Sequence, residues 1–171
     1  MYIERWNHQL RIPVPGSPIL SVDEAAARYD RKEFVLVVDG TRGDDGSHQP
    51  RWLMGLGRRG VRMSFLNSQG STWRLIDYDA REGRLWRWKT VDYTYASDDR
   101  YYALNAPTQK ITSCFEPDGT GCIDFDDKSK EVVDRARFES APMVANFWMD
   151  WPEFGQWNGL TDPDYGIDMS Q

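Results

Sequence analysis

The sequence predicts an α+β protein built on a mainly antiparallel β-sheet of consecutive hairpins, with one or two short helices. From residue 51 onward, short apolar-rich segments follow one another, separated by turns of Gly, Asn, Asp and Pro. Apolar and polar side chains alternate within these segments, as in a sheet with one solvated face. Residues 21–29 carry the signature of a helix start. The 171 residues are expected to form a single α+β domain over 1–171.

A short helix is predicted at residues 22–31. Ser21 and Glu24 match the capping-box pattern, in which the Ser side chain accepts a hydrogen bond from the first turn and the Glu side chain accepts one from the cap. Three alanines at 25–27 then favour a helix. The apolar segment 33–38 predicts a buried strand, and the Gly- and Asp-rich residues 40–50 predict an exposed loop.

The rest of the chain is predicted to be mainly strands and turns. Strands are expected at 52–56, 61–66, 72–78, 85–95, 101–104, 110–115 and 122–125. A second helix is predicted at 129–139, with a strand around Phe138 as the alternative, and a short strand at 144–149. The alternation places four basic side chains on the solvated face of the sheet: Arg62, Arg74, Arg87 and Lys89.

The two cysteines, Cys114 and Cys122, flank a turn that contains Pro and Gly. Two strands joined by this turn place the thiols near each other across a hairpin. The N-terminal residues 1–11 lack the apolar core of a secretory signal, which favours a cytoplasmic protein. We therefore expect both cysteines to be reduced.

No catalytic or metal-binding motif is found in the sequence. His8 and His48 are the two histidines, and neither accompanies a recognisable nucleophile motif. The carboxylate pairs do not follow the calcium-loop pattern, and the cysteines lack a second pair for zinc. Residues 55–60 match G-x-G-x-x-G, but a strand-like segment follows where dinucleotide binding needs a helix, so a hairpin turn is predicted. We therefore expect no catalytic residue, no metal and no cofactor.

The C-terminal segment 138–171 differs in charge from the rest of the chain. It contains six acidic residues and no Lys or Arg, so the formal net charge of −6 arises there. It also holds large aromatic residues at Phe147, Trp148, Trp151, Phe154, Trp157 and Tyr165. Core packing accounts for aromatic residues but needs no particular sign of charge, whereas a binding surface does. The segment is interpreted either as a packed element or as an acidic recognition surface that attracts a basic protein and repels nucleic acid.

Residues 146–157, with the sequence NFWMDWPEFGQW, resemble the aromatic, proline- and acid-containing C-terminal ends of small bacterial immunity proteins that accompany polymorphic toxins. Chain size, acidic balance and the α+β prediction are also similar. The resemblance implies a cytoplasmic protein that binds one cognate secreted toxin and blocks its active site. An acidic surface suits a toxin with a basic active-site cleft. We expect a monomer when free, with no direct nucleic-acid ligand and no membrane contact.

This interpretation assigns roles to individual residues of the C-terminal segment. The expected aromatic anchors, which slow dissociation, are Trp151, Phe154 and Trp157. The expected steering and pairing groups, which accelerate association, are Asp150, Glu153, Asp162 and Asp164.

Two other classes of protein remain open at this point. One is a small-ligand-binding or enzymatic α+β domain with an aromatic pocket on the sheet and His48 on its rim. The residues of that expected pocket are Trp86, Trp88, Tyr93 and Tyr95. The other is a structural subunit whose C-terminal aromatic residues are buried against a second copy.

Overall fold

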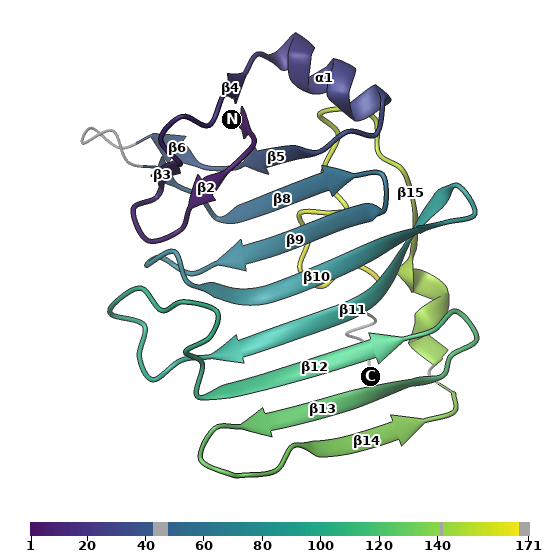
Figure 1. The fold of residues 1–171 in the computed structure, drawn as a ribbon. Coiled ribbons are helices and arrows are strands. Elements are labelled where there is room, and N and C mark those ends of the chain that lie inside the picture. Colours follow the sequence, from purple (N-terminus) through teal and green to yellow (C-terminus); the bar gives the residue numbers. More distant parts are fainter. Residues whose placement is uncertain (43–47, 141, 168–171) are drawn as a thin grey trace.

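The computed structural model describes residues 1–42, 48–140 and 142–167 (Figure 1). These residues form an 11-stranded sheet, two separate two-stranded ribbons, one α-helix and one 3₁₀ helix. The N-terminal elements are β1 (Tyr2–Ile3), β2 (Trp6–Asn7), β3 (Ile12–Pro13), β4 (Ile19–Leu20), α1 (Val22–Asp30), β5 (Val35–Val38), β6 (Thr41–Arg42) and β7 (His48–Gln49). The remaining elements are β8 (Trp52–Gly57), β9 (Gly60–Leu66), β10 (Thr72–Arg81), β11 (Arg84–Thr94), β12 (Gln109–Phe115), β13 (Gly121–Asp127), β14 (Asp134–Phe138), η1 (Pro142–Phe147) and β15 (Trp148–Asp150).

The large sheet has the order β14-β13-β12-β11-β10-β9-β8-β5-β1-β4, and β15 pairs with the start of β11. Strands β8 to β14 pair with their neighbours in sequence, and the pairs of the sheet are antiparallel. The predicted fold class, α+β with a large antiparallel sheet, is therefore confirmed. Ribbon β2–β3 lies against the sheet, and ribbon β6–β7 occupies the ends of the predicted loop 40–50, whose residues 43–47 lie outside the described part of the chain.

Residues 55–60 form the predicted hairpin turn, not a phosphate-binding loop. Gly57 pairs with Gly60 across a two-residue turn. Gly60 has φ 140°, and a Cβ at this position would lie 1.8 Å from the backbone O of Tyr78. Glycine is required here because any side chain would collide with the neighbouring strand β10.

Helix α1 begins as the sequence predicts. The Ser21 side chain accepts a hydrogen bond from the backbone N of Glu24 at 3.2 Å, and Glu24 accepts one from the backbone N of Ser21 at 2.8 Å. The helix buries Ala25 and Tyr29 at one end of the sheet (Figure 1). It ends at Asp30, one residue earlier than predicted, and Lys32 then takes the left-handed conformation with φ 57°.

Three predicted elements differ from the structure. Residues 101–104 form no strand, because this loop is fixed by the Tyr102 ring stacked on Tyr95 and by the Tyr102 backbone N donating to Ser71 Oγ at 2.7 Å. The predicted helix 129–139 is wrong, since residues 134–138 form β14 against β13. The Arg135 guanidinium binds Asp124 across these strands, which favours the extended alternative. The predicted strand 144–149 is mostly η1, and β15 begins at Trp148.

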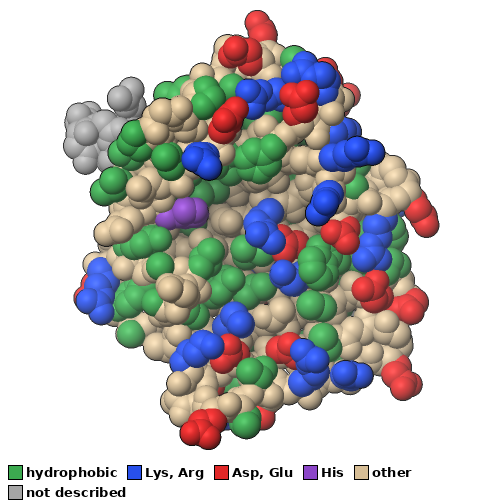
Figure 2. Space-filling model, in the orientation of Figure 1, with side chains coloured by type: hydrophobic (Ala, Val, Ile, Leu, Met, Phe, Trp, Pro, Cys, Tyr) green, Lys and Arg blue, Asp and Glu red, His purple; other side chains and the backbone are tan. Residues whose placement is uncertain are grey.

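The two faces of the sheet have different environments. The back face lies behind the sheet in Figure 1 and is covered by the C-terminal residues 148–167, which pack Met149, Trp157 and Leu160 on the sheet. Its strands contribute Met54, Leu56, Val61, Met63, Phe65, Ile76, Tyr78 and Leu85 to this main core. The front face is partly covered by ribbon β2–β3, where a smaller core forms from Ile3, Trp6, Val38, Leu53 and Leu66. The rest of the front face is open (Figure 2).

The prediction that four basic side chains share the solvated face is corrected. Arg62 and Lys89 lie on the front face with Asp77, whereas Arg74 and Arg87 contact the C-terminal residues 163–165 at the back. Ordinary alternation along β10 places Arg74 on the face opposite to Asp77 and its partner Arg62, and a bulge separates Arg87 from Lys89. Lys89 pairs with Asp77 and Arg87 pairs with Tyr78, so β11 contains one extra residue between these pairs. The extra residue reverses the alternation, which sequence periodicity cannot detect.

Candidate functional site

The C-terminal segment is held on the back face by a cluster of aromatic rings at the end of α1. The Trp157 ring lies 5.6 Å from the Tyr29 ring and 5.6 Å from the Phe154 ring, centroid to centroid. Phe154 also stacks on Tyr2 at 5.2 Å. The Tyr29 hydroxyl donates to the backbone O of Pro152 at 2.5 Å, so α1 fixes both side chains and backbone of the segment. Trp151 lies at the edge of this cluster, with Lys32 Nζ 3.9 Å from its ring centroid.

Two arginines of the back face hold the far part of the segment through its backbone. Arg87, which is 1% exposed, donates to the backbone O of Tyr165 at 2.6 Å and of Pro163 at 3.4 Å. Its other donors reach Thr90 Oγ1 at 3.1 Å. Burial lowers the pKa of Arg87, since the charged form loses hydration. Arg74 binds Asp92 at 2.5 Å and Asp164 at 2.6 Å, which completes the attachment.

The structure separates the predicted partner-binding residues into packed and exposed groups. Trp157 is 8% exposed and belongs to the main core, while Phe154 and Trp151 are half-buried against it. The three rings therefore lie together, but mainly as core. The four acidic side chains are exposed. Asp150 pairs with Arg84 at 2.7 Å and Asp164 pairs with Arg74, whereas Glu153 and Asp162 form no ion pair with the residues described.

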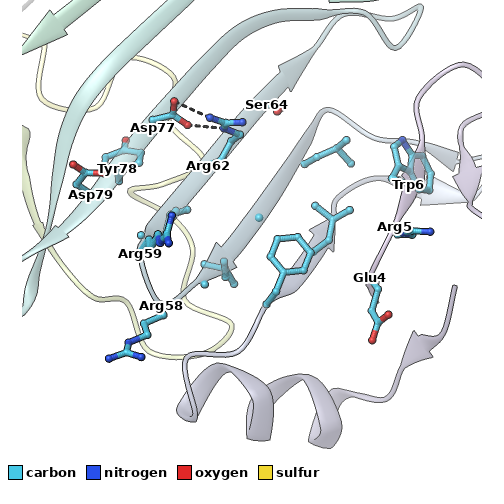
Figure 3. A pocket seen from close by; sticks show the side chains of 18 of the residues that line it. Glu4, Arg5, Trp6, Arg58, Arg59, Arg62, Ser64, Asp77, Tyr78 and Asp79 are labelled. Atoms are coloured by element: carbon cyan, nitrogen blue, oxygen red, sulfur yellow. Dashed lines mark hydrogen bonds and ion pairs between the residues drawn. The ribbon is translucent and has the colours of Figure 1, made fainter.

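A second candidate surface, which the sequence did not predict, is a groove of about 1030 Å³ on the front face (Figure 3). Its floor is the hairpin β8–β9, and its sides come from residues 4–8, from Phe34 and from β10 and β11. The floor is low because Gly55 and Gly57 project no side chains into it. Burial lowers the pKa of His8, which also lines the groove, so this imidazole is neutral near pH 7. Figure 2 shows basic side chains, interspersed with acidic ones, across this part of the front face.

The aromatic pocket expected for the ligand-binding alternative is not found in the predicted place. Trp88 lines the groove, but Trp86 is fully buried against Phe147 and Trp148. Tyr93 and Tyr95 stack on each other at 6.5 Å and do not line the groove, although Tyr93 lies near the lining residues Arg62 and Asp77. The predicted rim residue His48 instead contacts the edge of Trp6. The G-x-G pattern at 55–57 in an alternating strand was the sequence signal for the groove, because both glycines fall on one face.

The cysteines and the acidic pairs are placed by the hairpins. Cys114 and Cys122 are register partners on β12 and β13 and are not bridged, and burial raises the pKa of the Cys114 thiol. Asp126 pairs with Lys110 at 3.3 Å and Lys128 at 2.6 Å. Within the described ranges, no group of three or more His, Cys, Asp or Glu side chains is arranged to hold a metal ion.

Comparison of this chain with protein-family models, with curated proteins and with solved structures finds no match. Among the described residues, no helix has the length and apolar character needed to cross a membrane.

Burial of the Tyr78 hydroxyl makes the free energy of unfolding depend on pH in the alkaline range. Its hydroxyl is buried without a hydrogen-bond partner among the described residues, and burial raises its pKa to about 12. In the unfolded chain the Tyr78 hydroxyl titrates near pH 10. Folding therefore opposes its ionisation, and the stability linked to the neutral hydroxyl is fully present below about pH 10 and is lost as pH rises towards 12. We expect Tyr78→Phe to keep or raise the free energy of unfolding at pH 7, by up to about 1 kcal/mol, and to reduce its loss between pH 9 and pH 11. Urea unfolding at each pH measures this.

Tyr95→Phe is the matched comparison for Tyr78→Phe. Burial also raises the pKa of Tyr95 to about 12, but its hydroxyl donates to the backbone O of Thr72 at 2.8 Å. Removing this hydroxyl should therefore lower stability at pH 7 by about 1 kcal/mol. If Tyr78→Phe is the more destabilising of the two at pH 7, the assignment of Tyr78 as an unpaired hydroxyl is wrong.

Proposed function

We propose that this protein acts by binding another protein, as an immunity-type inhibitor that blocks a cognate bacterial toxin in the cytoplasm. The observation that carries the proposal is the C-terminal segment: it presents exposed acidic side chains on a backbone anchored by buried rings and by Arg87. An anchored segment loses little conformational entropy on binding, so its charges are already in place for a partner. A toxin with a basic active-site cleft is the partner that this surface fits.

The exposure and contacts of the predicted residues suggest a different role in binding for each. Glu153 and Asp162 have no ion pair with the described residues, so a partner can meet their charges without displacing an internal cation, although Asp162 also accepts a hydrogen bond from the backbone N of Asp164 at 2.9 Å. Asp150 is 85% exposed at its side chain although it pairs with Arg84. Trp151 is the anchor that we favour, because it is only half-buried, whereas Trp157 is committed to the core. Charge should govern association, and Trp151 should govern dissociation.

The test begins with capture of the partner from the native host by the tagged protein, followed by its identification and purification. Glu153→Lys/Asp162→Lys is then compared with wild type by surface plasmon resonance. We expect the association rate to fall about tenfold at low ionic strength, with a smaller difference as salt screens the charges. Trp151→Ala should instead raise the dissociation rate. Wild-type protein should also inhibit the toxin's activity.

A matched control separates a local effect from the change in net charge. Glu82→Lys/Glu131→Lys alters the charge by the same amount at two exposed residues outside the C-terminal segment, and neither residue has an ion pair with the described residues. This variant should associate at close to the wild-type rate. Equal slowing in both double variants would mean that only total charge matters, and no slowing in either would exclude the acidic segment from the interface.

A further inference from the structure

The front-face groove has a shape suited to a ligand. Its volume of about 1030 Å³ lies at the upper end of the range for small-molecule sites. Gly55 and Gly57 leave the floor without side chains. The Phe34 ring covers Gly55, where a Cβ would be 3.4 Å from Phe34 Cε2, whereas Gly57 is open, with a Cβ there 4.0 Å from Phe34 Cδ2. Neither glycine has a positive φ, so backbone conformation does not require glycine there. Gly55 therefore leaves room for the Phe34 ring, and Gly57 leaves an open part of the groove floor that a larger residue would fill.

The groove offers flat apolar surface to a ligand. Phe34 is a large hydrophobic residue, yet it is 53% exposed. Trp88 lines another side and is half-buried, with Lys89 Nζ 4.8 Å from its ring centroid. Exposed ring faces over a glycine floor favour a planar aromatic group, because stacking buries both faces of such a group.

The groove is electropositive although the whole chain carries a net charge of −6. Its acidic side chains already have basic partners: Glu4 pairs with Arg28 at 2.8 Å, Asp77 with Arg62 and Lys89, and Asp79 with Arg81. Arg81 is shared with Glu116 at 2.9 Å, so Asp79 is neutralised only in part. By contrast, three arginines of the lining have no ion pair with the described residues: Arg5, Arg58 and Arg59. Arg62 and Lys89 share the single charge of Asp77, which adds one more positive charge at the centre.

The arginines lie at the ends of the groove. Figure 3 shows Arg58 and Arg59 at the β8–β9 turn, and Arg5 with Trp6 on the opposite side. A guanidinium group presents a planar set of donors that matches the oxygens of a phosphate or carboxylate. The overall negative charge of the protein disfavours anions elsewhere, so this local excess of positive charge selects for a ligand that fits the groove.

We propose that this groove binds a small aromatic anion, a planar ring system that carries a phosphate or carboxylate group. The ring lies over Gly57 beside the Phe34 ring, which already covers Gly55, and the anionic group binds Arg58 and Arg59 at the hairpin turn. This inference goes beyond the proposed inhibitor function and does not depend on it, because the groove lies on the face of the sheet opposite the C-terminal segment.

Two aryl phosphates test the proposal, each against its parent without phosphate. The pairs are 1-naphthyl phosphate with 1-naphthol, and flavin mononucleotide with riboflavin, with inorganic phosphate as the charge-only probe. Binding to the full chain is measured by fluorescence titration and calorimetry. We expect at least one aryl phosphate to bind about tenfold more tightly than its parent and than inorganic phosphate, because the ring and the charge contribute together.

Variants locate the site. Arg58→Ala/Arg59→Ala should weaken binding of the aryl phosphate about tenfold, since neither residue has a positive φ and the turn tolerates Ala. Phe34→Ala should weaken binding of the aryl phosphates but not of inorganic phosphate. Gly57→Val fills the floor and suits a strand, so it should block the ring while leaving the thermal midpoint nearly unchanged. Arg137→Ala, an exposed arginine on β14 without an ion pair to the described residues, is the control and should bind as wild type.

The contradicting outcomes are specific. Failure of both aryl phosphates to bind more tightly than their parents would overturn the proposal, because an apolar patch would account for all binding. Equal weakening by Arg58→Ala/Arg59→Ala and by Arg137→Ala would also overturn it, since binding would then follow total charge. Loss of partner inhibition in the C-terminal variants has no bearing on these outcomes, so the two proposals fail separately.

Discussion

Replacing Arg87 with Ala is expected to lower the free energy of unfolding by about 3–5 kcal/mol. This side chain is 1% exposed and donates to the backbone oxygens of Tyr165 and Pro163 as well as to Thr90. Its removal takes the guanidinium donor from the backbone O of Tyr165, leaves Pro163 O with the Arg74 contact at 3.3 Å, and opens a cavity between the sheet and the C-terminal segment. Urea unfolding followed by tryptophan fluorescence gives the change directly.

Arg84→Ala provides the comparison for Arg87→Ala. Arg84 also binds the C-terminal segment, through Asp150 at 2.7 Å, but the two side chains are 47% and 85% exposed. Exposed ion pairs contribute little, so we expect a loss of less than about 1 kcal/mol. Arg87→Lys keeps the charge but cannot reach all three acceptors, and its stability should fall between those of wild type and Arg87→Ala. A loss below about 1 kcal/mol for Arg87→Ala would show that the segment is held without its guanidinium.

Replacing Trp157 with Ala is the second large effect, with an expected loss of about 3–5 kcal/mol. Trp157 is 8% exposed and fills the space between α1 and the back face, in ring contact with Tyr29 and Phe154. The loss should appear as a lower midpoint in urea and as a thermal midpoint lower by roughly 10 °C. Weak binding by this variant would therefore not identify Trp157 as a contact residue.

Trp151→Ala distinguishes the core residue from the surface anchor. Trp151 is half-buried at the edge of the same cluster. Its ring forms a cation–π contact with the exposed Lys32, whose Nζ lies 3.9 Å from the ring centroid. Such a contact contributes about 0.5–1 kcal/mol, so Trp151→Ala should be clearly less destabilising than Trp157→Ala. If the two variants lose equal stability, Trp151 belongs to the core as well, and its assignment as a partner-binding anchor loses its support.

The parts of the fold that depend on neighbouring residues were predictable from the sequence. The capping box at Ser21 and Glu24 is a local hydrogen-bond pattern, and α1 begins where that pattern requires. The turns from β8 to β11 and from β12 to β13 combine Gly, Asn or Asp with alternating strands, so these hairpins were also predicted, whereas the β11–β12 connection was wrongly given a strand at 101–104. The segment 129–139 was harder, because a single strand of five residues offers too few positions to distinguish a period of 2 from a period of 3.6.

The parts that depend on distant residues were not predictable. The extra residue between Arg87 and Lys89 reverses which face each side chain occupies, and no local pattern marks it. The sequence identified the aromatic and acidic character of the C-terminal segment but could not say which rings α1 would cover. The groove was missed because it joins residues 4–8 with strands β8 to β11, and such pairing requires knowledge of the sheet order.

The most direct test of the proposed inhibitor function is hydrogen–deuterium exchange of the protein with and without its captured partner, read peptide by peptide. We predict that the partner slows exchange in peptides from the C-terminal segment around Asp150, Glu153 and Asp162, and in the adjacent end of α1. Protection confined to the front face, in the β8–β9 hairpin and residues 4–8, would contradict binding through the acidic segment and would place the partner at the groove instead.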